Sequence, residues 1–179
     1  EPKELYADIA RSPGLAWTAA AWAAACGGLI GLALGWDWSL AFLLPVIPVL
    51  VALSVIDFRT RLLPTRLIQP AYLLVAAGLV VAWVATRDTP DLVRALVGAL
   101  IAFVVFFLMW FINPRGMGYG DVRLSGVLGL ALGHLGWGQL FVGLYAGFLI
   151  FGLPGLTLAV LRRDRALLKT AYPFGPFMV

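Results

Sequence analysis

Two aspartates, Asp57 and Asp121, each lie at the edge of a long apolar segment of the sequence. A carboxylate at a membrane boundary costs free energy unless it has a partner or a function. Two carboxyl groups that meet at the same depth can supply both a base that activates water and an acid that protonates a leaving amine. We therefore hypothesise an intramembrane aspartic peptidase. This chemistry needs no metal, and one His and one Cys offer no plausible zinc set.

Each aspartate also has a simpler interpretation. Asp57 could be an interfacial anion that pairs with Arg59 or Arg61, and Asp121 could be the N-cap of a helix that follows a glycine turn. Membrane carboxylates also serve proton-coupled transporters, so a transporter subunit is the alternative function. A non-catalytic assembly scaffold is a third hypothesis, in which neither carboxylate is required.

The composition is that of a membrane protein. Of the 179 residues, 62% are hydrophobic and 12% are charged, whereas soluble domains carry about 25% charge. The apolar residues fall in blocks of about 20, long enough to cross a bilayer as helices. The sequence predicts an all-α polytopic protein with one transmembrane domain over 1–179. That domain is a bundle of about six transmembrane helices plus the start of a seventh, preceded by a short N-terminal segment, 1–14.

The predicted spans are 15–35, 38–56, 67–85, 92–112, 117–137 and 139–161. The fifth is the most informative, because its apolar part from Leu124 to Trp137 is only 14 residues long. Extending it back to Met117 gives 21 residues, which is enough to cross the bilayer and brings Asp121 into the membrane. Irregular backbone at such depth needs cover by protein or a wet cavity, so we expect Asp121 in a sheltered pocket. Glycines repeat on two spans and predict close helix packing: Gly27, Gly31 and Gly35 on the first, and Gly126, Gly129, Gly133 and Gly136 on the fifth.

The distribution of Lys and Arg predicts the orientation. If the N-terminus is cytoplasmic, eleven of these cations fall on the cytoplasmic side and two, Arg87 and Arg94, fall on the other. Both aspartates are then cytoplasmic. The net charge of +4 is explained by cations beside the spans, where anionic lipid attracts them. The sequence has no basic stripe with interleaved aromatics, so nucleic-acid binding is not expected.

Two glycines precede Asp121. Gly118 and Gly120 permit backbone conformations that other residues avoid, and they would allow an extended substrate to pass close to the backbone. The chain begins at Glu1 and ends at Val179, where a new apolar stretch starts. We therefore expect it to be part of a longer protein that has a further N-terminal portion and a final helix.

Three segments, in order, resemble the type IV prepilin peptidase family. Gly118-Tyr119-Gly120-Asp121 matches its Gly-x-Gly-Asp signature. The segment from Asp57 to Leu63-Pro64 resembles its first aspartate motif, and Pro173-Phe-Gly-Pro-Phe177 resembles a run near its last helix. Presenilin-like peptidases share Gly-x-Gly-Asp but pair it with Tyr-Asp, whereas Ile56 precedes Asp57 here.

The resemblance implies a catalytic dyad of Asp57 and Asp121, with Gly118, Tyr119, Gly120 and Pro64 as motif or substrate-groove residues. It implies a bacterial inner-membrane enzyme whose N-terminus and active site are cytoplasmic. Its substrates would be prepilins or pseudopilins of type IV pili and type II secretion, cleaved after a glycine, and neither the particular pilin nor an oligomeric state is implied.

The sequence departs from the family pattern in three places. Thr65 stands where the family often has Asp or Asn, and Arg123 stands where Lys is common; neither supplies the dyad. Many members also carry a four-cysteine region associated with S-adenosylmethionine-dependent N-methylation, whereas Cys26 is the one cysteine of this chain. Either the part of the protein with that region is missing from this sequence, or the chain is a variant that lacks the region. The resemblance therefore implies no cofactor for the peptidase, and S-adenosylmethionine only if a methyltransferase activity is present.

Overall fold

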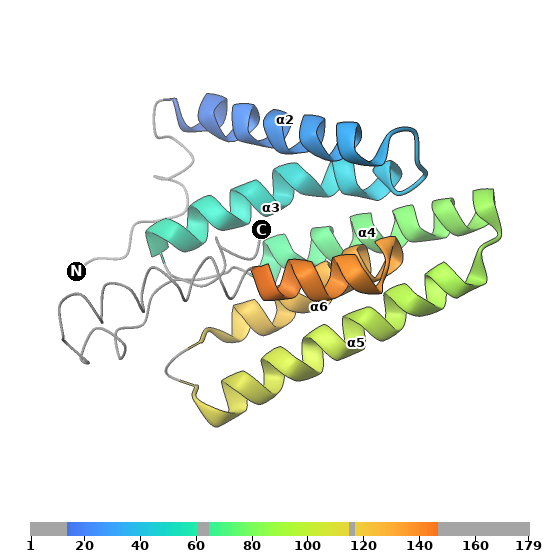
Figure 1. The fold of residues 1–179 in the computed structure, drawn as a ribbon. Helices are drawn as coiled ribbons and strands as arrows, with labels where there is room; N and C mark the ends of the chain where they lie inside the picture. Colours follow the sequence, from blue (N-terminus) through green and yellow to red (C-terminus); the bar gives the residue numbers. More distant parts are fainter. Residues whose placement is uncertain (1–13, 61–64, 115–116, 147–179) are drawn as a thin grey trace.

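The computed structural model describes residues 14–60, 65–114 and 117–146. Five long helices form a bundle in these ranges (Figure 1). They are α2 (Leu15–Leu34), α3 (Leu40–Thr60), α4 (Thr65–Thr86), α5 (Thr89–Ile112) and α6 (Tyr119–Leu135). Residues 137–146 are also helical. The described part of the chain is thus all-α, as predicted.

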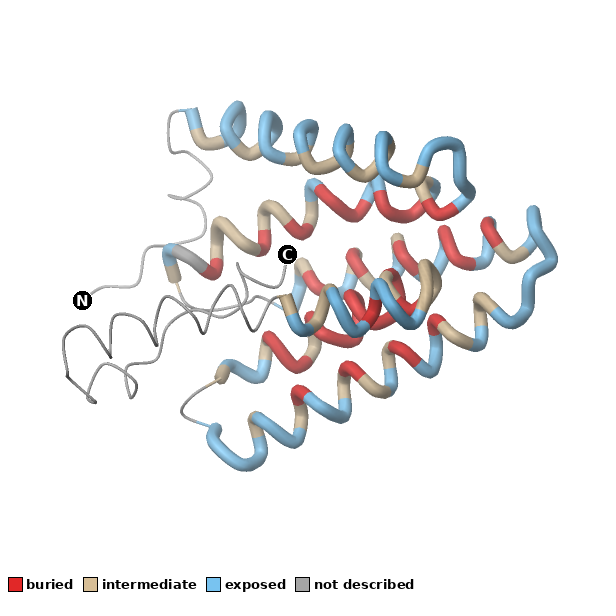
Figure 2. Tube along the Cα trace, viewed as in Figure 1, coloured by how far each residue is buried: buried red, intermediate tan, exposed pale blue. Residues whose placement is uncertain are grey.

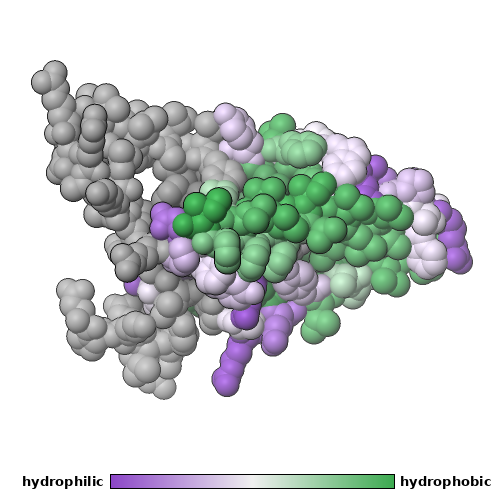
Figure 3. All heavy atoms as spheres, turned by 90° about the horizontal axis from the view of Figure 1, so that it is seen from below, coloured by the Kyte–Doolittle hydropathy of each residue, from purple (hydrophilic) through white to green (hydrophobic). Residues whose placement is uncertain are grey.

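Four of the helices are long and apolar enough to cross a membrane. They are α2, the Leu40–Asp57 part of α3, α4 and α5. Large apolar side chains of α5, such as Leu100, Leu108 and Phe111, are more than half exposed, and an apolar surface covers the middle of the molecule in Figure 3. Such a surface matches lipid rather than water. The chain is therefore a multi-pass helical membrane protein, while the count of six spans and a seventh stays a prediction, because 147–179 lie outside the described residues.

The fifth predicted span is shorter than expected and lies inside the bundle. Helix α6 has 17 residues, about 26 Å at 1.5 Å per residue. It begins at Tyr119 rather than Met117, because Gly118 is the N-cap with an extended backbone at φ −73° and ψ 144°. Most of its residues are buried, and it packs mainly on α5 and α4 (Figure 2). Neighbouring helices thus provide the cover that the prediction required for Asp121.

Small residues bring α5 and α6 into backbone contact, as the glycine pattern predicted. A Cβ on Gly129 would lie 2.7 Å from the carbonyl oxygen of Gly98 and 2.7 Å from Cα of Ala99. A Cβ on Gly133 would lie 2.9 Å from the carbonyl oxygen of Arg94. The prediction was wrong for Gly136, which ends α6 at φ 150° instead of packing on that face.

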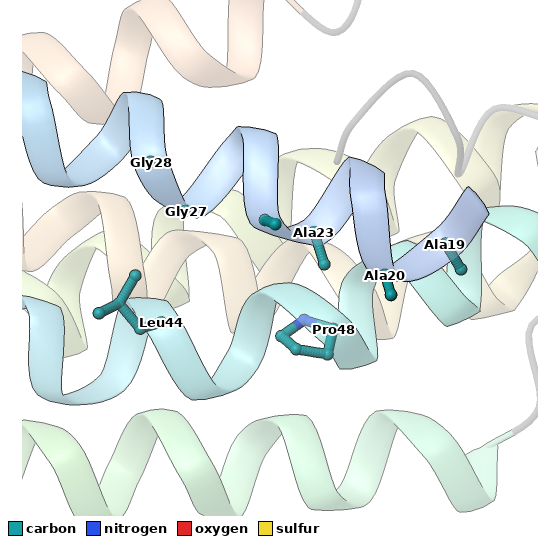
Figure 4. Close-up of a pocket in the computed structure, with 8 residues that line it drawn as sticks. Ala19, Ala20, Ala23, Gly27, Gly28, Leu44 and Pro48 are labelled. Carbon is teal, nitrogen blue, oxygen red and sulfur yellow. The ribbon is translucent and has the colours of Figure 1, made fainter. Parts of the chain in front are cut away.

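Helix α2 packs less tightly than its glycines predicted. Gly27 makes a close approach to α3, since a Cβ there would lie 3.3 Å from Cδ2 of Leu44. A Cβ on Gly31 would meet no atom within 4 Å, and Gly35 ends the helix at φ 65°. Between α2 and α3 lies a hollow of about 640 Å³ (Figure 4). Its walls carry no ionisable group; they are formed by Ala19, Ala20, Ala23, Ala24, Gly27, Gly28, Leu44 and Pro48.

Candidate active site

Asp57 lies in the last turns of α3 and is 3% exposed. The predicted spans 38–56 and 67–85 are therefore too short where they face each other, because α3 continues to Thr60 and α4 begins at Thr65. Residues 57–60 contain neither Gly nor Pro, and the hydroxyl of Thr60 donates to the carbonyl oxygen of Ile56 at 2.8 Å within the helix. Asp57 is thus held on a helix and not on a loop. Arg61 and the predicted motif residue Pro64 lie outside the described residues.

Asp121 lies in the first turn of α6 and is also 3% exposed. It is not the N-cap, since Gly118 occupies that position, but its Oδ2 accepts a hydrogen bond from the Gly118 N–H at 3.2 Å. The positive end of the helix dipole favours a carboxylate there. Its Oδ1 is buried and has no hydrogen-bond partner among the described residues. One oxygen of Asp121 is thus held in place and the other is left for a further interaction.

The register of α3 against α6 brings the two aspartates to the same end of the bundle. The C-terminal end of α3 and the N-terminal end of α6 both lie at the left of Figure 1, so the helices run antiparallel. At the opposite end, Phe42 of α3 packs edge-on against His134 of α6, with ring centroids 5.4 Å apart. Asp57 follows Phe42 by 15 residues, and Asp121 precedes His134 by 13.

These spacings correspond to about 22 and 20 Å of helix. The two carboxyl groups therefore lie at nearly the same depth, and their charges interact. His134 lies in the last turn of α6, which runs to Leu135.

The predicted groove residues lie beside Asp121. Gly118 is exposed and Tyr119 is 40% exposed, while Gly120 is half-buried in the first turn of α6. Neither Gly118 nor Gly120 uses the backbone conformations that glycine alone permits, since neither has a positive φ. A Cβ on Gly118 would meet Oδ2 of Asp121 at 3.5 Å, an ordinary contact. Close approach of a substrate to this backbone stays a prediction.

A set of contacts around Arg123 was not predicted. Its guanidinium lies 4.9 Å from the ring centroid of Tyr119 and donates to the hydroxyl of Thr65 at 2.5 Å. Its backbone carbonyl accepts a hydrogen bond from the hydroxyl of Tyr72, on α4, at 2.8 Å. Tyr119 in turn packs edge-on against Trp110 of α5, with ring centroids 5.0 Å apart. No local pattern in the sequence pairs residues of α4 with residues of α6, so spacing alone offered no signal for these contacts.

The described residues include no cluster of three His, Cys, Asp or Glu side chains of the kind that holds a metal ion. The hollow between α2 and α3 (Figure 4) has only small apolar and aliphatic walls. Among the described residues, the buried carboxyl groups, Asp57 and Asp121, lie instead at the end of the bundle where α3 ends and α6 begins.

The family profile and the similar curated proteins agree with each other. The sequence profile of the type IV leader peptidase family matches residues 44–160, which include Asp57 and Asp121. Three similar curated proteins are all named prepilin leader peptidase/N-methyltransferase. The one from Pseudomonas putida is 35% identical over 84% of this chain and 52% of its own length. The one from Aeromonas hydrophila is 33% identical over 82% and 48%, and the one from Escherichia coli K12 is 35% identical over 72% and 54%.

The chain spans about half the length of the curated relatives that it matches. No solved structure gives a significant match. The profile match covers well over half of the chain, and the relatives agree with it over more than 70% of the chain. The chain therefore belongs to the type IV leader peptidase family.

Proposed function

We propose that the chain is an aspartic endopeptidase of the membrane that removes the leader peptide of type IV prepilins or pseudopilins. Asp57 and Asp121 are its catalytic pair. The observation that carries the proposal is the pair itself: two buried carboxyl groups from distant segments, at the same end of the bundle and within range of each other's charge. A fold that buries two like charges together without a function would bear a large electrostatic cost.

The chemistry follows from the sharing of one proton. Two carboxyl groups that share a buried site cannot both ionise comfortably, so one is protonated while the other is ionised. The ionised carboxylate removes a proton from a water molecule as that water attacks the scissile carbonyl carbon. The protonated carboxyl then gives its proton to the leaving nitrogen as the C–N bond breaks. The pair has exchanged roles after one turnover, and the unpartnered Oδ1 of Asp121 is the oxygen that we assign to this proton exchange.

The substrate and the side of cleavage follow from the relatives and from charge. The relatives are named as prepilin leader peptidases, which supports a prepilin substrate. Among the described residues, the end of the bundle with the aspartates also carries Arg59, Arg66 and Arg123. Short cationic segments stay in the cytoplasm. We place the site on the cytoplasmic face of the bacterial inner membrane, where it would cleave the prepilin after a glycine, just before its apolar helix.

N-methylation, which the names of the relatives also mention, is not part of the proposal. S-adenosylmethionine carries an adenine, a ribose and an amino acid, and all of these need polar partners. The hollow between α2 and α3 has no polar side chain on its walls. This hollow therefore does not fit the cofactor, and no step is assigned to it.

The test is co-expression of the full-length protein with a prepilin, with the mass of the pilin as the readout. Asp57→Asn and Asp121→Asn keep the size of each side chain but cannot act as carboxyl acid or base. Each is expected to leave the pilin unprocessed while the variant stays folded in detergent. The matched control is Asp88→Asn, at the opposite end of the bundle. Asp88 is the N-cap of α5, a position where Asn serves equally well.

The rival functions give different results. A proton-coupled transporter subunit predicts substrate- or proton-dependent flux in liposomes and no processing by the wild type. A scaffold predicts that both Asp→Asn variants function normally. Full processing by either variant would refute the proposed mechanism.

A further inference from the structure

Several contacts between α4 and α6 lie close to Asp121 along α6. The hydroxyl of Tyr72 donates to the backbone carbonyl of Arg123 at 2.8 Å, two residues beyond Asp121. One turn further on, α6 carries Gly126, where an added Cβ would overlap the Tyr72 hydroxyl. Gly126 thus leaves a notch in α6 that the Tyr72 hydroxyl fills. The side chain of Arg123 makes a second contact with the same helix through Thr65, seven residues before Tyr72.

Helix α4 is in turn tightly packed on α3, the helix that carries Asp57. Gly78 of α4 lies against Phe42 of α3, where an added Cβ would come within 2.9 Å of the Phe42 Cα. Buried residues of the two helices belong to one hydrophobic cluster, which includes Leu53 on α3 and Val75 on α4. The position of α4 along α3 is therefore fixed by backbone contact.

We propose that Tyr72 is a positioning residue, whose hydroxyl fixes the height of Asp121 relative to Asp57 through the path α3–α4–α6. The inference rests on the proposed function, since it concerns the geometry of the proposed dyad. Tyr72 does not touch the carboxyl groups in this account. It acts by pinning the backbone of α6 just after Asp121. The hydrogen bond from Tyr72 depends on Gly126, because a side chain at that position would displace the Tyr72 hydroxyl from the Arg123 carbonyl.

A pair of substitutions tests this directly. Tyr72→Phe removes the hydroxyl and keeps the ring; we expect kcat on a purified prepilin to fall roughly tenfold with KM unchanged. Gly126→Ala should lower both stability and kcat, because the new methyl group collides with the Tyr72 hydroxyl. In the double variant the nearest ring atom is Cζ at 3.2 Å, so a small shift removes the collision. The double variant should recover stability while its kcat stays low.

The controls are matched in chemistry. Tyr145→Phe changes an exposed tyrosine of the 137–146 helix, and Gly31→Ala adds a methyl group that meets no atom within 4 Å. Both should keep wild-type stability and kcat. Asp57→Asn and Asp121→Asn are assayed with the same substrate.

The outcomes separate the two proposals. If the Asp→Asn variants cleave, the proposed function fails and the inference fails with it. If they are inactive but Tyr72→Phe has the kcat of Tyr145→Phe, the function stands and Tyr72 has no positioning role. Recovery of kcat together with stability in the double variant would also overturn the inference, because Tyr72 would then be only a packing residue. A low kcat in a double variant of restored stability supports it.

Discussion

Arg94 binds the C-terminal end of α6, and removing its side chain should destabilise the protein. The last carbonyl groups of a helix have no partner within the helix, and in a membrane each unsatisfied group costs several kcal/mol. Arg94 of α5 donates from Nε to the carbonyl oxygen of Gly133 at 2.8 Å and from a terminal guanidinium nitrogen to that of His134 at 2.6 Å. We predict that Arg94→Met, which keeps the aliphatic stem, loses both bonds.

The magnitude follows from the number and kind of bonds. Hydrogen bonds to charged groups contribute about 1.5–3 kcal/mol each, and the Arg94 side chain is 22% exposed, so solvent compensates part of the loss. We expect the free energy of unfolding to fall by about 3 kcal/mol. Arg94 also pairs with Asp91 at 2.5 Å, but the Asp91 side chain is 32% exposed. Asp91→Asn should therefore cost less than about 1 kcal/mol.

The assay is reversible unfolding in mixed micelles, followed by the loss of helical circular dichroism. Arg94→Lys should recover only part of the stability, because one ammonium group cannot reproduce the planar fork that reaches both carbonyls. The control is Arg87→Met in the α4–α5 connection, where the guanidinium lies over the Trp83 ring at 5.6 Å. If Arg94→Met and Arg87→Met have the same stability, or if Asp91→Asn accounts for the whole loss, the capping argument is wrong.

Two further predictions concern the ends of the bundle. Gly118→Ala should change the free energy of unfolding by less than about 0.5 kcal/mol, because its φ is −73° and the added Cβ meets Asp121 at 3.5 Å. A loss of cleavage by this folded variant would show that substrate passes close to the Gly118 backbone. Full activity would refute that role. In the α2–α3 connection, hydrogen bonds from the Ser39 hydroxyl and backbone N–H hold the pKa of Asp37 below its ordinary 3.8. Its contribution to stability is thus present above about pH 4 and is lost as the pH falls further, so the stability difference between wild type and Asp37→Asn should shrink from about pH 6 to about pH 3.

The fold class could be predicted from the sequence because the bilayer imposes a length on every apolar segment. The boundaries of α2, α4 and α5 follow from block lengths and connections such as Arg87–Asp88. The end of α3 could not be predicted in the same way. Polarity marked Asp57 as the start of a loop, but a helix continues through polar residues when no Gly or Pro interrupts it, and α3 runs to Thr60.

The candidate site was partly predictable for a related reason. The cost of burying a carboxylate singles out Asp57 and Asp121 without any knowledge of the fold. The residues that hold them in place carry no such cost. Tyr72 resembles any other tyrosine of an apolar span, and Gly126 belongs to a series of glycines of which Gly129 and Gly133 face a different helix. Which neighbour a glycine faces depends on tertiary packing, and a single sequence contains little information on it.

The depth of Asp121 depends on the length of α6 more than on its hydrophobicity. At 17 residues, α6 is about 4 Å shorter than the hydrocarbon core, so a membrane-spanning α6 would leave one of its ends below a membrane surface. Arg94, anchored on α5 near the Arg87–Asp88 connection, holds the C-terminal end of α6 at its own surface. The shortfall therefore falls at the N-terminal end, where Asp121 is buried. The arginine at one end of α6 and the register of the carboxylate pair at the other are thus two parts of one arrangement.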